Sequence, residues 1–232
     1  MKGRAIMIIR DLMSLLSGQL DQMAQAGVFA RLVALLFVIT FCLAVHEFAH
    51  ALAAKKLGDH TAFNHGRLTL NPIKHFDPIG TTMILLVGFG YAKPVPVNPR
   101  NLEYRRFKHR GQQKCMAIVA AAGPLSNFIL AAVFWGLSHV TLRLMLNSMF
   151  AGGEITEPNL YFWMLDVFCR TVMSFNIGLG IFNLLPIPPL DGSRILDLFL
   201  PIRASLWMSR NERYFRYALM GLLFLLFLFT RF

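Results

Sequence analysis

With 232 residues, 56% of them hydrophobic, and a mean hydropathy of +0.53, the chain is more apolar than a typical soluble domain. A net charge of +11, from 23 basic and 12 acidic residues, would suggest a nucleic-acid partner in a soluble protein. In a membrane protein the same excess is expected in cytoplasmic loops, so we expect a multi-pass protein in a lipid bilayer, with no nucleic-acid partner. The odd number of cysteines and their wide spacing indicate neither a disulfide framework nor a cysteine metal site.

The N-terminal 30 residues have apolar side chains at helical spacing, but Arg10 and Asp11 interrupt the pattern. We expect either a helix lying in the membrane interface or a short first span. The first clear span is predicted over residues 32–54. It would be about 35 Å long, enough to cross the hydrocarbon core. Lys55 and Lys56 follow it directly.

An irregular region is predicted over residues 57–114. The stretch HGRLTLNPIKHFDPIG is punctuated by glycine and proline, which predicts short extended pieces. The following TTMILLVGFGY is apolar but too short to cross as a helix, so we expect a re-entrant loop packed against protein. Residues 93–114 are strongly basic.

Further apolar regions are predicted at 117–142, 160–190 and 217–230. Asp166 and Arg170 stand four residues apart and are expected to pair. The fold class is therefore an all-α polytopic membrane protein. Its parts would be an N-terminal helix at 1–30, a core at 31–198, and a basic segment with a last transmembrane helix at 199–232. Basic residues at 55–56, 93–114 and 194–216 place these segments in the cytoplasm and the 143–158 loop outside.

The stretch AVHEFAHALAA places three ionisable side chains inside the first predicted span. His46 and His50 lie one helical turn apart on one face, so both imidazoles can reach one metal ion. Glu47 points beside that ion, where a general base acting on water would stand. On a soluble helix these could be ordinary surface residues, but inside a membrane span ionisable groups are costly and usually functional.

A hydrolytic zinc site normally has three protein ligands, so a third is expected at similar depth. Asp191 follows three prolines at the cytoplasmic end of the third apolar region, the same end as His50. The prolines could simply end a span, with Asp191 capping the next helix. The unpaired His-x-x-x-His motif favours Asp191 as the ligand.

HEFAH followed by NLLPIPPLDG resembles the site-2 protease family of intramembrane zinc metalloproteases, whose second signature is N-x-x-P-x-x-P-x-D-G. The likeness covers about residues 32–198 and resembles the compact bacterial and archaeal members without an inserted PDZ or appended CBS domain. It implies a three-helix catalytic core with a re-entrant loop and flanking helices, in a prokaryotic cytoplasmic membrane. It also implies the site residues: His46, His50 and Asp191 binding one zinc ion, Glu47 as general base, Asn183 holding the substrate backbone or oxyanion, and Asn127 positioning substrate.

The expected function is therefore hydrolysis of peptide bonds in or near transmembrane segments of membrane protein substrates, with the active site opening toward the cytoplasm. The extended loop could pair with an unwound substrate strand by edge addition. One alternative is a catalytically silent adaptor of the same fold. Another is an ion transporter, which would usually show an internal repeat that this chain lacks. Among the remaining polar residues, His75 and Asp77 are expected to structure the loop, and His60, His65 and His109 to be surface residues.

Overall fold

The computed structural model describes residues 21–78, 80, 93–107, 109–150 and 157–229. The predicted re-entrant stretch and most of the predicted N-terminal helix lie outside these residues. The described part is helical and contains no β-strand. Its helices are α2 (Gln22–Phe37), η1 (Val38–Cys42), α3 (Leu43–Lys56), α4 (Thr61–Asn64), α5 (Pro72–His75), η2 (Tyr104–Arg106), α7 (Gly111–Phe150), α8 (Leu160–Asn183), α9 (Asp191–Leu196), α10 (Ile202–Arg210) and α11 (Glu212–Phe229).

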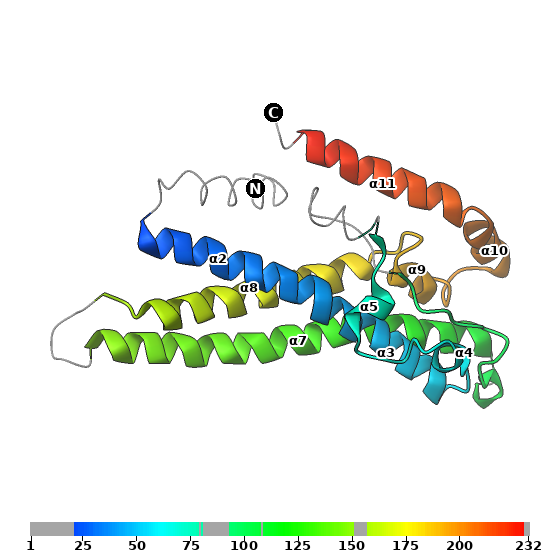
Figure 1. The fold of residues 1–232 in the computed structure, drawn as a ribbon. Coiled ribbons are helices and arrows are strands. Elements are labelled where there is room, and N and C mark those ends of the chain that lie inside the picture. The colour runs from blue at the N-terminus through cyan, green and yellow to red at the C-terminus, as the bar shows by residue number, and fades with distance from the viewer. Residues whose placement is uncertain (1–20, 79, 81–92, 108, 151–156, 230–232) are drawn as a thin grey trace.

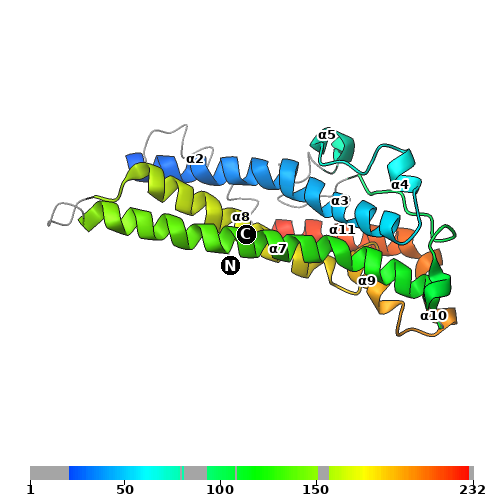
Figure 2. The ribbon, with the colours of Figure 1, turned by 90° about the horizontal axis from the view of Figure 1, so that it is seen from below.

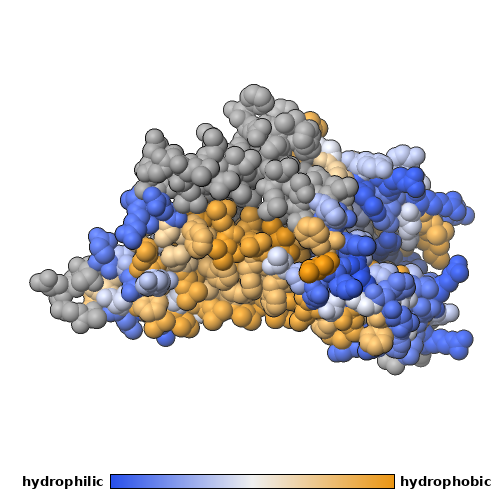
Figure 3. All heavy atoms as spheres, in the orientation of Figure 1, coloured by the Kyte–Doolittle hydropathy of each residue, from blue (hydrophilic) through white to orange (hydrophobic). Residues whose placement is uncertain are grey.

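Three of the described helices are long and apolar enough to cross a membrane. They are the continuous helix Gln22–Lys56, made of α2, η1 and α3, together with α7 and α8. The three run side by side along the molecule (Figures 1 and 2). Over part of their length the surface is a broad hydrophobic area, and hydrophilic side chains gather at the end that carries α4, α9 and α10 (Figure 3). The prediction of an all-α polytopic membrane protein is confirmed.

The ends of these helices differ from the predicted spans because of local capping. The first helix begins at Gln22 rather than at residue 32, since the Asp21 carboxylate accepts a hydrogen bond from the Ala24 N–H at 2.7 Å. The third span begins at Leu160 as predicted, where the Asn159 side chain caps the Tyr161 N–H. It ends at Asn183, before the prolines, rather than at residue 190.

Small and apolar side chains hold the three spans together. Ala34, Val38 and Cys42 of the first helix pack with Phe134 of α7 and with a valine and a cysteine of α8, namely Val172 and Cys169. The three cysteines all belong to the described residues; they are buried and form no disulfide there. Lipid is as apolar as these side chains, so in a bilayer the contacts stabilise mainly through close van der Waals packing.

The predicted pair of Asp166 and Arg170 is confirmed, with the arginine Nε donating to the carboxylate at 2.7 Å. Thr141 of α7 donates to the other carboxylate oxygen at 3.3 Å. Asp166 is buried, whereas Arg170 is half exposed. The aspartate therefore joins α7 to α8 without leaving its charge unpaired in the span.

The loop after α3 is less extended than predicted. Residues 64–78 contain the single-turn helix α5, because the Asn71 side chain caps the Ile73 N–H and Pro72 takes the first helical position. Within the stretch expected to be extended, residues 72–75 are therefore helical, whereas residues 67–71 lie outside any helix, and their pairing with an unwound substrate strand stays a prediction. This loop and α4 lie against α3 (Figure 1).

The last span was predicted at residues 217–230. It does not belong to the three helices that are long and apolar enough to cross a membrane among the described residues. Its helix α11 begins at Glu212, and its first two turns also carry Arg213 and Arg216. Its uncharged part from residue 217 onward is about 20 Å long at 1.5 Å per residue, short of a hydrocarbon core of about 30 Å. A membrane span at this place stays a prediction.

Candidate metal centre

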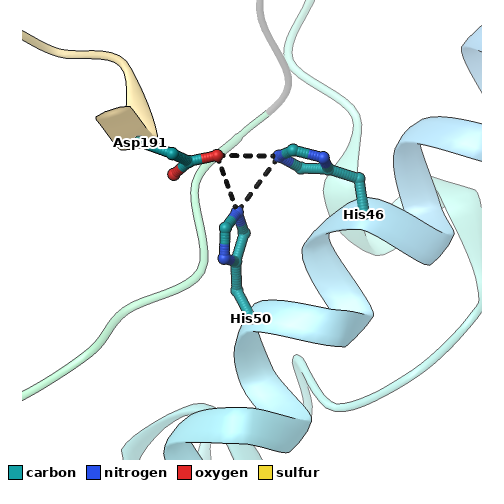
Figure 4. Close-up of side chains that lie close together, drawn as sticks. All are labelled: His46, His50 and Asp191. Atoms are coloured by element: carbon teal, nitrogen blue, oxygen red, sulfur yellow. Dashed lines mark hydrogen bonds and ion pairs between the residues drawn. The ribbon is translucent and has the colours of Figure 1, made fainter. Parts of the chain in front are cut away.

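Three potential ligand atoms meet where α3 faces the start of α9 (Figure 4). The Nε2 atoms of His46 and His50 lie 3.0 Å apart. The Asp191 Oδ2 atom lies 3.4 Å from the first and 3.3 Å from the second. Both histidines are buried, and no described hydrogen bond satisfies this aspartate oxygen. Residues separated by more than 140 positions in sequence thus form one compact donor set.

The size of this triangle fits a metal ion. Ligand atoms at about 2.0–2.1 Å from a tetrahedral ion stand about 3.3 Å from one another. The three measured separations, 3.0, 3.3 and 3.4 Å, lie close to that value. Two imidazoles and one carboxylate are also a donor set that leaves a fourth position open. The residues present therefore fit a metal ion of this kind.

The His50 ring is held by a contact from α7. Its Nδ1 atom lies 2.8 Å from the Val119 carbonyl oxygen, which can only accept, so Nδ1 carries the proton. In the neutral ring the Nε2 atom then has a free lone pair directed at the other two ligand atoms. A backbone carbonyl of the second span thereby fixes both the tautomer and the orientation of His50.

Gly123, one turn after Val119, lets α7 approach α3 closely enough for that contact. A Cβ atom at Gly123 would lie 2.5 Å from the His50 Cε1 atom and 2.6 Å from the His46 Cε1 atom. Real Cβ atoms do not approach neighbours this closely. A side chain at this position would therefore displace the imidazole rings or the helix, and both imidazoles lie against the bare backbone of α7.

A tight proline-containing turn brings Asp191 to the histidines. The α8 helix ends at Asn183, and the chain reverses through residues 184–190, which include a cis bond between Pro188 and Pro189. Helix α9 then begins at Asp191 itself. The Ser193 hydroxyl bonds the Leu190 carbonyl at 2.7 Å, and the backbone of Gly192 lies directly against Leu184. Close packing of this turn thus fixes the backbone position of Asp191, from which the carboxylate extends toward the histidines.

Glu47 is held from outside its own helix. One of its carboxylate oxygens, Oε2, accepts a hydrogen bond from the backbone N–H of Val95 at 3.0 Å. It is not one of the three convergent ligand atoms. The donor belongs to the loop that follows the first span, so loop and helix meet beside the metal centre.

The two predicted asparagines are placed differently. Asn127 lies on α7 one turn after Gly123, is fully buried, and has no hydrogen-bond partner for either amide atom among the described residues. Asn183 is the last residue of α8 and donates to the Leu179 carbonyl at 3.0 Å. No hydrogen bond joins Asn183 to the three ligands in the described part of the chain.

The other histidines stay away from the centre. His75 is buried and bonds the Thr69 carbonyl at 2.8 Å, while Asp77 accepts from the Gly80 N–H at 2.8 Å, so both organise the loop as expected. The surface position predicted for His60, His65 and His109 is confirmed by their exposure.

Sequence reasoning missed the residues that support the centre rather than form it. Val119 acts through its carbonyl, and Val95 acts through its N–H, which no side-chain pattern reveals. Arg67 is only 8% exposed and donates to the Lys93 and Pro94 carbonyls next to Val95, and no sequence pattern marks it. Gly123 carried a usable signal, because it stands in a run of small residues that predicts close helix approach.

The chain is similar to known proteins over most of its length. The model of Peptidase family M50 matches residues 34–228. "Putative zinc metalloprotease YwhC" of Bacillus subtilis is 42% identical over 173 residues, covering 73% of this chain and 70% of the relative. Proteins named "Putative zinc metalloprotease Rip2" are similar too. The Mycolicibacterium smegmatis protein is 30% identical over 75% of this chain and 59% of its own length. The Mycobacterium tuberculosis protein is 28% identical over 78% of this chain and 62% of its own length.

The chain thus spans about three fifths of the mycobacterial relatives and a larger share of the Bacillus protein. No solved structure matches it. The family match extends over the metal-ligand candidates on α3 and α9, over α7 and α8, and over the first apolar helix from residue 34 onward. The predicted resemblance to site-2 proteases is confirmed, and the chain is an integral membrane protein that belongs to Peptidase family M50.

Proposed function

We propose that this protein is an intramembrane zinc endopeptidase that hydrolyses peptide bonds in or near transmembrane segments of membrane protein substrates. The observation that carries the proposal is the convergence of His46, His50 and Asp191 at separations suited to one tetrahedral ion. Relatives named as zinc metalloproteases support zinc as that ion, with one per chain. The two histidines lie within a helix long and apolar enough to span the membrane, which supports a membrane-embedded substrate.

His46, His50 and Asp191 would hold the zinc ion, which supplies Lewis acidity and lowers the pKa of a bound water toward about 7. Glu47 stands next to His46 and is not a ligand, so its carboxylate is free to act as a general base. It takes a proton from the attacking water and returns that proton to the leaving nitrogen. The hydrogen bond from Val95 occupies one carboxylate oxygen and leaves the other for this transfer.

Asn127 and Asn183 are proposed to bind the substrate backbone. The unpartnered amide of Asn127 is buried on the α7 face that carries Gly123, so it can donate to a carbonyl brought close to the metal ligands. Asn183 stands at the start of the turn that carries Asp191. A transmembrane helix hides its carbonyls in internal hydrogen bonds, so the substrate has to unwind before either amide can reach it.

The active site is proposed to open toward the cytoplasm. His50 is followed within two turns by Lys55 and Lys56, and Asp191 is followed by Arg194. Basic residues flank the cytoplasmic ends of spans, so both ligand-bearing segments belong at that side. The hydrophilic end of the molecule also lies on the side of α4, α9 and α10 (Figure 3).

A catalytically silent adaptor of the same fold would bind transmembrane helices without hydrolysis. The two proposals differ at Glu47. Glu47→Gln keeps all three ligands but cannot accept a proton, so zinc per protein should stay at the wild-type level while cleavage falls by at least about 10²–10⁴. His46→Ala and Asp191→Ala remove ligands and should lose zinc and cleavage together.

The experiment measures zinc content and cleavage of a membrane-helix substrate in detergent for the wild type and these variants. An inactive wild type with full zinc content, or a Glu47→Gln variant that cleaves at the wild-type rate, would refute the proposed mechanism.

A further inference from the structure

A short proline-rich stretch of the loop, residues 93–96, passes beside the proposed general base. Its sequence is KPVP, and proline has no N–H, so Val95 is the single backbone donor among residues 94–96. That donor is the one that bonds Glu47, at 3.0 Å. The two prolines also fix their own φ angles, which stiffens the chain on both sides of Val95. The loop thus presents one N–H to one carboxylate oxygen.

Arg67 holds the opposite side of the same peptide unit. Its Nη2 atom donates to the carbonyl oxygens of Lys93 and Pro94, each at 3.1 Å. The Pro94 carbonyl and the Val95 N–H belong to one planar trans peptide, so they point in opposite directions. Arg67 and Glu47 therefore bond this peptide from its two sides, and the arginine fixes the direction in which the N–H points.

The positive charge of Arg67 also strengthens the hydrogen bond from the Val95 N–H to Glu47. A guanidinium bonded to a carbonyl polarises the peptide and strengthens its N–H as a donor. Arg67 is only 8% exposed, and no carboxylate lies within ion-pair distance of it among the described residues. Burying a cation is costly unless its donors are satisfied, and here two loop carbonyls provide that compensation.

Two further contacts fix the loop at either end of this stretch. The Lys93 N–H donates to the His75 carbonyl at 2.9 Å. Beyond the stretch, the Asn98 N–H donates to Asp59 at 2.7 Å. Neither contact involves the 94–95 peptide itself. Among the described residues, Arg67 is the side chain that bonds the carbonyl side of this peptide, opposite Glu47.

We propose that Arg67 is a positioning residue: it holds the 94–95 peptide so that the Val95 N–H orients Glu47 for proton transfer. This inference rests on the proposed function, in which Glu47 is the general base. Activation of a nucleophile depends on a general base that a third group holds in the right orientation. Arg67 touches neither substrate nor metal in this role, so its loss should reduce kcat and leave zinc binding intact.

The test compares Arg67→Met, which keeps length but has no donor, with Arg67→Lys, which keeps a cationic donor. Arg100→Met, at an exposed arginine of the same loop, is the matched control. Three quantities are measured on the full-length protein: kcat and KM for a membrane-helix substrate, zinc per protein, and hydrogen exchange at the Val95 amide.

Arg67→Met should lower kcat by about 10–100-fold, a part of the 10²–10⁴ that general-base catalysis contributes. KM and zinc content should stay near wild type, and the Val95 amide should exchange faster. Arg67→Lys should recover most of kcat, and Arg100→Met should match the wild type. Val95→Pro deletes the donor and leaves Arg67 in place, so it should reproduce the kcat loss even if Arg67→Met fails to fold.

The possible negative results separate an error in this inference from an error in the proposed function. An unchanged kcat or unchanged Val95 exchange in Arg67→Met, with an active wild type, would refute this inference alone. Loss of zinc, or a raised KM at constant kcat, would also refute it, because Arg67 would then act on the ligands or on substrate. A zinc-loaded wild type that cleaves no faster than Glu47→Gln would refute the proposed function instead.

Discussion

The sharpest structural prediction concerns Gly123→Ala in α7. The added Cβ would lie 2.5 Å from the His50 Cε1 atom and 2.6 Å from the His46 Cε1 atom. Ordinary contacts between carbon atoms are about 3.5–4.0 Å, so the overlap is about 1 Å. Ligand distances in a metal site tolerate about 0.2 Å. Either the imidazoles or the helix must therefore move several times farther than the site allows.

We expect zinc affinity to fall by at least about 10–100-fold, the range seen when groups that orient metal ligands are lost. That corresponds to about 1.4–2.7 kcal/mol of binding free energy. Helix stability works in the opposite direction, because alanine is about 0.8–1.0 kcal/mol more favourable than glycine inside a helix. A loss of zinc therefore cannot be attributed to weakening of α7.

The assay is a competitive chelator titration on purified protein, with zinc per protein measured at each step. Gly136→Ala is the matched control, since Gly136 is in the same helix and a Cβ there meets nothing within 4 Å. The control should keep wild-type affinity and gain slightly in thermal stability. Wild-type affinity in Gly123→Ala would show that the close approach of α7 to the histidines is wrong.

Three further predictions follow from the turn, the loop and the topology. Gly192→Ala should lower zinc content, because a Cβ there would meet the Leu184 and Leu185 backbone and displace Asp191; wild-type zinc content would contradict this packing. Burial raises the pKa of Asp59, but hydrogen bonds from Thr61, the Asn98 N–H and Asn101 outweigh it and hold that pKa below the usual range. The stability that the ionised carboxylate contributes is therefore present above about pH 4 and lost as pH falls through the folded-state pKa, so Asp59→Asn should flatten the acid side of a Tm-against-pH curve; parallel curves would contradict this. Single cysteines replacing Lys56 and Glu157 should be labelled from the cytoplasm and from outside respectively, and labelling of position 56 from outside would overturn the topology.

Several features follow from the sequence with few assumptions. Ionisable side chains in an apolar run are costly, so HEFAH already indicated a function for His46, Glu47 and His50. Helical periodicity put the two histidines on one face, and the proline-rich signature pointed to Asp191. Long apolar runs gave the three spans, and spacing alone gave the Asp166–Arg170 pair. These features are local or nearly so, and local rules of spacing and cost are sufficient for them.

The tertiary structure decided the rest because it depends on backbone atoms and on long-range contacts. The His50 tautomer is set by the carbonyl of Val119, 69 residues away, and Glu47 is bonded by an N–H 48 residues away. Every residue has a carbonyl, and every residue except proline has an N–H, so no side-chain pattern marks the ones that matter. The start of the first helix at Gln22 and the turn at α5 also departed from prediction, since single caps at Asp21 and Asn71 outweighed the broader composition. The pattern of apolar and ionisable side chains thus determines which functional groups enter the membrane. Packing of α7 and the loop against α3 determines how the side chains of those groups are oriented.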